Sequence, residues 1–285
     1  RQKPLAVVLP ETVEQIKQTL LLCKQHNTPV VTRGAGTGLA GGALPLENSV
    51  VLGLSKLSAV KSIDPEQQTA VVEPGVRNIV ISEAVAMHGL YYAPDPSSQI
   101  ACTIGGNVAE NSGGVHCLKY GLTVHNVIAI KMFTIDGEEL SLHRDDDGLG
   151  LLALMNGSEG LLGVITEVTV KLTPKPAIAR LIMAGFDHVR DCANAVSNII
   201  EAGIIPAGLE MMDKFAIKAA EDYAHAGYPR EAQALLLCEL DGDEDIVEQE
   251  IASVLSILSE ASTIKLSENE HERLALWQGR KSAFP

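Results

Sequence analysis

A glycine-rich loop constrains the fold of this chain more than any other feature of its sequence. Five glycines occur within ten residues, in the stretch Arg33-Gly34-Ala35-Gly36-Thr37-Gly38-Leu39-Ala40-Gly41-Gly42. The pattern ahead of the loop predicts a strand at residues 5–9, a helix that begins at residues 11–14 and a strand at residues 30–32. These three elements form a βαβ unit, whose crossover is expected to be right-handed.

The loop matches the G-x-G-x-x-G fingerprint of Rossmann domains at residues 36–41, and it follows a strand. A Rossmann domain also requires a helix directly after the glycines, because the pyrophosphate lies on the helix N-terminus. Here Pro45 and turn-forming residues follow, and neither Glu47 nor Asp64 ends a clear second strand, as an acidic ribose partner would. The sequence therefore disfavours a Rossmann domain.

Two interpretations of the loop remain. Its N–H groups can turn inward as an anion nest, with the hydroxyl of Thr37 and the charge of Arg33 as further donors. The plainer interpretation is a mobile surface loop. Two more glycine-rich segments, residues 93–114 and 156–167, favour the nest. The first of them has apolar residues at every fourth position, which suits a loop pressed against a large flat ligand, and a helix start at Thr103 that can face a phosphate.

The pattern predicts an α+β protein of two domains, residues 1–176 and 177–285, divided at the Pro-rich segment 173–176. The first domain has 13 basic and 17 acidic residues, and the second has 9 and 19. The second domain alternates strands with helices, which indicates a ferredoxin-like sandwich. Its predicted strands are residues 178–186, 207–211, 234–240 and 263–266, and its predicted helices are residues 188–202, 213–225, 244–260 and 269–280.

Composition excludes several classes of protein. The net charge is -14 and only 4% of the residues are aromatic, so the chain lacks the basic groove and stacking platforms of a nucleic-acid binder. The apolar runs are only strand-length, which predicts no membrane span. The five cysteines form no C-x-x-C pair, which indicates free thiols in a reducing compartment. The chain begins without Met and ends just after a helix-like segment, so we expect it to be part of a longer protein.

Four ordered motifs together resemble the PCMH-type FAD-binding domain of the vanillyl-alcohol oxidase superfamily. They are RGAGTGLAGG at residues 33–42, PDPSSQIACTIGGNVAENSGG at 94–114, KYG at 119–121 and GSEGLLGVITE at 157–167. Within that superfamily the chain is most similar to the glycolate oxidase FAD-linked subunits, which are related to D-lactate and D-2-hydroxyglutarate dehydrogenases. The stretches GLEMMD, LLCELDG and WQGRK in the second domain extend this resemblance along the chain. It implies an FAD-binding domain of two α/β subdomains, followed by an incomplete ferredoxin-like cap domain.

The resemblance also implies which residues hold FAD. The first loop is expected to wrap the pyrophosphate, through Arg33, Gly34, Gly36, Thr37, Gly38, Gly41 and Gly42. The second segment is expected along the ribityl chain and isoalloxazine, through Pro94, Ser98, Thr103, Gly105, Gly106, Asn107 and Asn111. The third is expected at the adenine side or the ring edge, through Glu159, Gly160, Gly163 and Ile165. Thr37 stands where some relatives carry a flavin-linked His, which implies noncovalent FAD, and Cys102 is expected to be a packed thiol.

The implied reaction is oxidation of a small 2-hydroxy acid, glycolate or D-lactate, to the 2-oxo acid, with hydride passing to flavin N5. An arginine in the second domain is expected to hold the substrate carboxylate, and Arg280 is the candidate; an ordinary exposed arginine is the alternative. The family's His pair and metal site lie in a region beyond this chain, and the histidines present form no metal-ligand pattern. His116 follows the second segment and is either a catalytic or a structural loop residue.

Other readings are a noncatalytic FAD-binding subunit of the same complex and a nicotinamide-dependent reductase on the same fold. The latter lacks a second domain of this kind. The resemblance implies partners, namely iron–sulfur and second FAD-binding subunits of an oxidase complex. It also implies a cytoplasmic protein, peripheral at the inner membrane, where the acidic second domain could assist docking.

Overall fold

The computed structural model describes residues 2–282, which form two units. Unit 1 comprises residues 2–114 and 121–175, and unit 2 comprises residues 115–120 and 176–282. The chain therefore enters unit 2 twice. The sequence predicts residues 115–120 in the first domain, but Val115 is buried in a core cluster of unit 2. No local pattern signals this packing, because the partners of the segment lie far along the chain.

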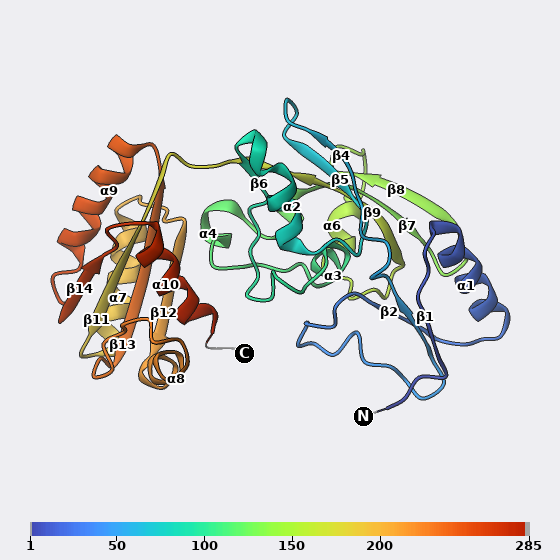
Figure 1. Ribbon diagram of the computed structural model, residues 1–285, viewed down its shortest axis with the longest axis horizontal. Coiled ribbons are helices and arrows are strands. Elements are labelled where there is room, and N and C mark those ends of the chain that lie inside the picture. Colours follow the sequence, from blue (N-terminus) through green and yellow to red (C-terminus); the bar gives the residue numbers. More distant parts are fainter. Residues whose placement is uncertain (1, 283–285) are drawn as a thin grey trace. The chain divides into compact units, whose positions relative to one another are not determined.

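The first part of unit 1 is a βαβ unit with a three-stranded parallel sheet in the order β1-β3-β2. Helix α1 is amphipathic: Ile16, Leu20 and Cys23 share one buried face, and Thr12 caps its N-terminus by accepting a hydrogen bond from the N–H of Gln15. Figure 1 shows this helix beside the blue strands. The elements are β1 (Ala6–Val8), α1 (Val13–Gln25), β2 (Val30–Arg33) and β3 (Val50–Gly53).

The second part of unit 1 is a five-stranded antiparallel sheet in the order β4-β5-β9-β7-β8. Apolar side chains of three helices pack with its strands in one core cluster. At the surface of the same sheet, Glu167 of β9 forms ion pairs with Lys61 and Lys131 on β4 and β7. The strands are β4 (Val60–Asp64), β5 (Thr69–Val72), β7 (Val127–Phe133), β8 (Glu139–His143) and β9 (Val164–Lys171), and the helices are α2 (Asn78–Val85), α3 (Ile104–Glu110) and α6 (Leu151–Met155).

Short elements complete unit 1. They are the 3-10 helix η1 (Ala86–His88), the helix α5 (Thr123–Asn126) and the antiparallel pair β6 (Leu90–Tyr91) and β10 (Thr173–Pro174). Phe133 and Val164, from strands of the antiparallel sheet, join the core cluster of the parallel one. The two subdomains of unit 1 therefore share apolar contacts.

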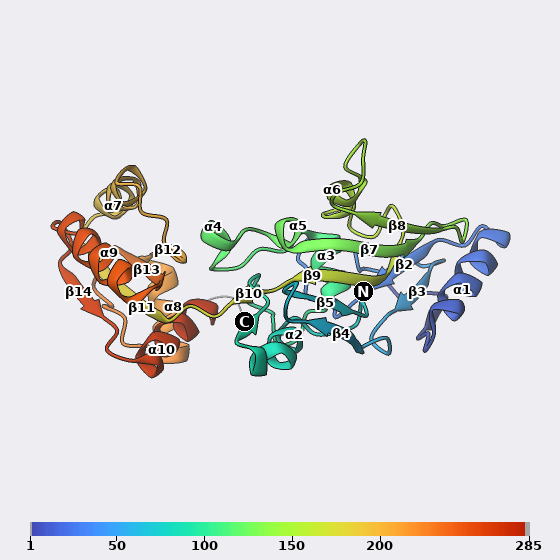
Figure 2. The same cartoon turned by 90° about the horizontal axis from the view of Figure 1, so that it is seen from above.

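Unit 2 has a four-stranded antiparallel sheet in the order β12-β13-β11-β14. This is the ferredoxin-like order, with strands two, three, one and four of the unit side by side. Helices α7 and α9 cover one face and α8 and α10 the other (Figure 2), which explains why β13 is buried along nearly its whole length. The elements are α4 (Cys117–Tyr120), β11 (Ile178–Phe186), α7 (Val189–Glu201), β12 (Gly208–Asp213), α8 (Lys214–Ala224), β13 (Ala234–Gly242), α9 (Glu244–Ile257), β14 (Thr263–Leu266) and α10 (Glu270–Lys281).

Candidate functional site

The first glycine-rich loop leaves β2 as an exposed chain of unpaired donors. Among the residues that the structure describes, no acceptor receives a hydrogen bond from the backbone N–H groups of residues 34–42. The guanidinium of Arg33 folds back over Gly36 and forms no ion pair with any described residue. Gly36 has a φ of 74°, in the left-handed region that favours glycine. A cation beside successive unpaired N–H groups is an arrangement that can bind an anion.

The other two glycine-rich segments converge on this loop. A Cβ atom on Gly34 would collide with the hydroxyl of Thr103 at the start of α3. A Cβ on Gly38 would lie 2.9 Å from Oε1 of Glu110 at the end of α3, and one on Gly42 would lie 3.2 Å from Oε2 of Glu159. The three segments, distant in sequence, thus form one surface in unit 1.

Two buried polar atoms of the second segment lack partners. The hydroxyl of Thr103, a residue only 6% exposed, has no hydrogen-bond partner among the described residues, and Nδ2 of Asn107 has no oxygen or nitrogen partner there. Buried polar groups are normally paired, so such atoms call for a ligand. The sequence predicts that the helix start at Thr103 faces a phosphate, but some of its N–H groups are already bonded within the protein. The N–H groups of Ile104 and Gly105 already donate to the carbonyls of Val76 and Pro74.

The third segment is tied to the end of α3. The N–H groups of Gly157 and Glu159 donate to the carbonyls of Val108 and Ala109, at 2.9 and 2.8 Å. Glu159 has a φ of 52°, which is uncommon for a residue other than glycine. Partial burial, and then the negative charge of Glu159, raise the pKa of Glu110 above its usual value. Two carboxylates therefore flank the loop, and sequence analysis did not identify Glu110.

The remaining predicted FAD residues have mostly structural contacts. The carbonyl of Pro94 accepts from Nδ2 of Asn78, and Oδ1 of Asn111 accepts from the N–H of Val124. A Cβ on Gly163 would meet the backbone of Phe133, and Ile165 packs in the core of the antiparallel sheet. The other predicted residues lie within the three glycine-rich segments; they are Thr37, Gly41, Ser98, Gly106 and Gly160.

Arg280, the predicted carboxylate ligand, lies on α10 of unit 2 and is not an ordinary exposed arginine. Its side chain is 19% exposed, and its Nε and Nη2 lie 2.9 and 2.8 Å from Oε2 of Glu210 on β12. The helix is held closely here, because the hydroxyl of Tyr228 donates to the carbonyl of Leu276 and abuts Gly279. The guanidinium is therefore oriented by an acidic partner on the sheet.

A polar cluster that the sequence pattern does not reveal surrounds two buried carboxylates of β13. Glu239 is 2% exposed and Asp241 is 5% exposed. The first binds His116, at 3.0 Å from Nε2, and the second binds Lys119 and Tyr120. His116 thus has a definite structural contact. No sequence signal links these residues, since more than one hundred positions separate each pair.

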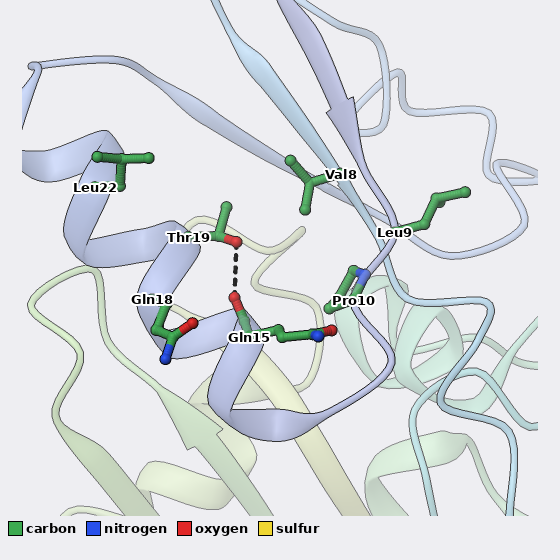
Figure 3. A pocket seen from close by; sticks show the side chains of 7 residues that line it. All are labelled: Val8, Leu9, Pro10, Gln15, Gln18, Thr19 and Leu22. Carbon is green, nitrogen blue, oxygen red and sulfur yellow. Dashed lines mark hydrogen bonds between the residues drawn. The ribbon is translucent and has the colours of Figure 1, made fainter.

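A pocket lies between the end of β1 and the outer face of α1 (Figure 3). It contains no ionisable side chain, and the hydroxyl of Thr19 is already bonded to the carbonyl of Gln15 at 2.7 Å. It offers no charged group for acid–base chemistry or for pairing with an anion. The lining residues are Val8, Leu9, Pro10, Gln15, Gln18, Thr19 and Leu22.

Three further features of residues 2–282 bear on the nature of the site. No cluster of three or more His, Cys, Asp or Glu side chains there could hold a metal ion. No helix within that range is both long and apolar enough to cross a bilayer. Cys102 is buried, and burial raises the pKa of its thiol.

Comparison with known proteins identifies both units. The model of the FAD binding domain matches residues 4–143, and that of the FAD linked oxidases, C-terminal domain, matches residues 175–285. The glycolate oxidase subunit GlcD of Escherichia coli (strain K12) is 58% identical over the whole chain, which covers 58% of that protein. GlcD of Bacillus subtilis is 40% identical over 99% of the chain and 61% of its own length. The D-lactate dehydrogenase of Anaerostipes hadrus is 33% identical over 90% of the chain and 57% of its own length.

The fold has solved counterparts. An alkyldihydroxyacetonephosphate synthase structure superimposes with a TM-score of 0.79 at 21% identity, over 96% of this chain and 54% of that one. The chain thus spans a little over half the length of the proteins it matches. Two consecutive family domains together match most of its residues, in the order that the fold shows. Residues 4–143 therefore match the FAD binding domain, and residues 175–285 match the C-terminal domain of the FAD linked oxidases.

Proposed function

We propose that this chain holds FAD noncovalently in unit 1 and serves in the oxidation of a small 2-hydroxy acid, glycolate or D-lactate, to its 2-oxo acid. The observation that carries the proposal is the first loop, whose N–H groups and Arg33 guanidinium have no partners among residues 2–282 and would together bind an anion. The pyrophosphate of a dinucleotide carries two negative charges, which an anion site of this kind would bind. The relatives GlcD and D-lactate dehydrogenase, by their names, act on acids of this class.

Unit 1 fits the cofactor in a specific way. The loop of residues 33–42 would bind the pyrophosphate through its backbone and Arg33. Thr103, whose buried hydroxyl has no partner in the described part of the chain and lies against Gly34, would donate to the cofactor next to the loop. Residues 94–111 would follow the ribityl chain and ring, and residues 159–165 would lie at the adenine side or the ring edge. Thr37 offers no imidazole for a covalent link, which supports noncovalent binding.

Unit 2 would supply the substrate clamp. Arg280 can present a fork of N–H donors to a carboxylate, and Glu210 already fixes the plane of that fork. When bound, FAD would accept the hydride of the α-carbon, which carries both electrons of the oxidation, while the hydroxyl proton passes to a base. The contribution of the protein residues is to hold the acid by its carboxylate and keep the α-carbon oriented. Arg280→Lys should therefore raise KM for the acid, because a lysine cannot form the bidentate contact.

The decisive experiment is the visible spectrum of the purified full-length protein before and after anaerobic addition of glycolate or D-lactate. Flavin bands that bleach with one acid would establish the reaction and the preferred substrate. Flavin bands that persist with both acids would favour the alternative, a noncatalytic FAD-binding subunit of the same complex. A protein without flavin would contradict the assignment of the glycine-rich loops.

We further propose that the protein works in a complex with iron–sulfur and second FAD-binding subunits, as the word subunit in the name of GlcD suggests for that relative. Residues 177–285 carry 9 basic and 19 acidic side chains, which suits docking to a basic surface at the cytoplasmic side of the inner membrane. Copurification at low and high salt tests this. Association that does not weaken with salt would rule out the electrostatic part of the proposal.

A further inference from the structure

Glu239 is the most buried carboxylate among the described residues of unit 2. Its side chain bonds to two separate segments of the chain. From one side, Nε2 of His116 lies 3.0 Å from its Oε1. From the other, Nη1 of Arg273 donates to Oε2 at 2.8 Å, and the indole N–H of Trp277 donates to the same oxygen. The ring of Trp277 also meets the imidazole of His116 edge to face, with centroids 5.7 Å apart.

The segment that carries His116 is the strap, residues 115–120, which directly follows the second glycine-rich segment. Both ends of the strap are anchored on β13. Beyond the His116 contact, Nζ of Lys119 donates to the carbonyl of Asp241 at 2.6 Å, and the hydroxyl of Tyr120 donates to Oδ2 of Asp241 at 2.6 Å. Two buried carboxylates, two positions apart on one strand, thus hold the segment.

The other partners of Glu239 lie on the face of α10 that also carries the proposed substrate arginine. Arg273, Trp277 and Arg280 are spaced by four and three residues, so their side chains follow one stripe of the helix. Glu239 holds the first two, and Glu210 holds the third. Arg280 therefore shares one helix face with the two residues that Glu239 holds.

Stability alone does not account for a carboxylate at this position. Burial acts to raise the pKa of Glu239, but the hydrogen bond and charge of His116, the charge of Arg273 and the Trp277 hydrogen bond outweigh it and keep the pKa below its usual value. The group is therefore ionised at neutral pH. Well-packed apolar side chains commonly stabilise a core as much as a buried ion pair does. What a carboxylate adds is directional contact with several donors at once.

We propose that Glu239 is a positioning residue for the oxidation of the hydroxy acid: one carboxylate fixes both the strap and the face of α10 that carries Arg280. The strap and the clamp proposed to hold the substrate then share one anchor. This inference rests on the proposed function for its catalytic consequence. The anchoring itself is a property of unit 2 and can be tested without turnover.

The test uses the full-length holoenzyme and the variant Glu239→Gln, which keeps the shape of the side chain and removes its charge. We expect full FAD content, a KM for the acid raised about tenfold to a hundredfold, and a smaller change in kcat, as for loss of a charged hydrogen bond. The matched control is Glu270→Gln, which removes the exposed partner of the same Arg273 and should change KM less than about twofold. Hydrogen exchange should show faster exchange in both the strap and α10 only in Glu239→Gln.

The outcomes distinguish the anchoring role of Glu239 from its consequence for catalysis. Wild-type protein that no 2-hydroxy acid bleaches would contradict the proposed function, yet joint loss of protection in the strap and α10 would still support the anchor. Unchanged exchange in Glu239→Gln, or an equal rise of KM in Glu270→Gln, would overturn the proposal. If Glu239→Gln does not fold, Trp277→Phe removes one donor to Glu239 and keeps a ring. An unchanged KM and unchanged exchange of the strap in that variant would also overturn it.

Discussion

The first loop of unit 1 and strand β13 of unit 2 differ in how their polar groups are hydrogen-bonded. Residues 34–42 are mostly exposed, and their N–H groups and Arg33 have no partners in the described chain. Glu239 and Asp241 are buried, and each is bonded by side chains from distant segments. Exposed donors without protein partners remain available to water or a ligand, whereas the bonded groups of β13 do not. The contrast is between groups that we propose to bind a ligand and groups that hold the fold.

The largest expected effect is a loss of stability when the buried carboxylate of Glu239 is removed. Glu239→Ala leaves Arg273, His116 and the indole N–H of Trp277 without their common acceptor. Breaking a buried pair by removing one partner costs about 3–5 kcal/mol of unfolding free energy. Hydrogen exchange across a urea titration, read at peptides of unit 2, measures this loss. Arg230→Met, which removes an exposed ion pair with Asp222 in the same unit, should cost less than about 1 kcal/mol. Equal costs would show that Glu239 is not an anchor.

Local patterns predicted much of this architecture. The strand predicted at residues 178–186 is β11, and the helix predicted at residues 244–260 is α9, Glu244–Ile257. Periodicity finds such elements because burial on one face repeats along them. The predicted ferredoxin-like arrangement is confirmed by the strand order β12-β13-β11-β14.

Contacts between distant residues were not predictable in the same way. The glycine-rich loop is visible in sequence because glycine itself marks close approach, yet its neighbours Glu110 and Glu159 are ordinary acidic residues there. Glu239 lies in an apolar run, and nothing local distinguishes a charge that faces His116 from a surface residue. Only the antiparallel register of β13 and the return of the strap bring these groups together.

Arg33→Ala tests whether the exposed first loop binds the phosphates of FAD. Because Arg33 forms no ion pair in the described chain, its loss should change the unfolding free energy by no more than about 0.5 kcal/mol. A charged hydrogen bond to phosphate is worth about 1.5–3 kcal/mol, so the dissociation constant of FAD should rise roughly tenfold to a hundredfold. Flavin fluorescence titration of the deflavinated protein measures this. Lys56→Met, which removes an exposed lysine paired with Glu11, should leave FAD affinity unchanged. Unchanged affinity in Arg33→Ala would mean that the loop does not bind the phosphates.

Adjacent glycines of α3 separate cofactor contact from protein packing. A Cβ on Gly106 would meet only the hydroxyl of Thr103, at 3.4 Å, whereas one on Gly105 would lie 2.8 Å from Cβ of Pro74. Gly106→Ala should therefore keep the fold, with a gain of up to about 1 kcal/mol from helix propensity. Its methyl group would crowd a cofactor packed on α3, at a cost of about 1–3 kcal/mol in binding. Gly105→Ala should instead lower the melting temperature. Tight FAD binding by Gly106→Ala would show that the cofactor does not approach this helix.

The smallest expected effect concerns the one carboxylate beside the loop whose pKa is raised. Partial burial and the charge of Glu159 raise the pKa of Glu110, so the folded protein binds this proton more readily than the unfolded chain does. Ionised Glu110 therefore lowers stability at neutral pH, and this penalty disappears as the pH falls below the usual carboxyl pKa. Because Glu110 is largely exposed, Glu110→Gln should raise the unfolding free energy at pH 7 by less than about 0.5 kcal/mol. It should also tighten FAD binding, since a negative charge beside Gly38 opposes the pyrophosphate. Parallel titrations near pH 7 and pH 5 measure both quantities. An advantage of the variant that grows as the pH falls would contradict this assignment, because a raised carboxyl pKa requires the advantage to shrink.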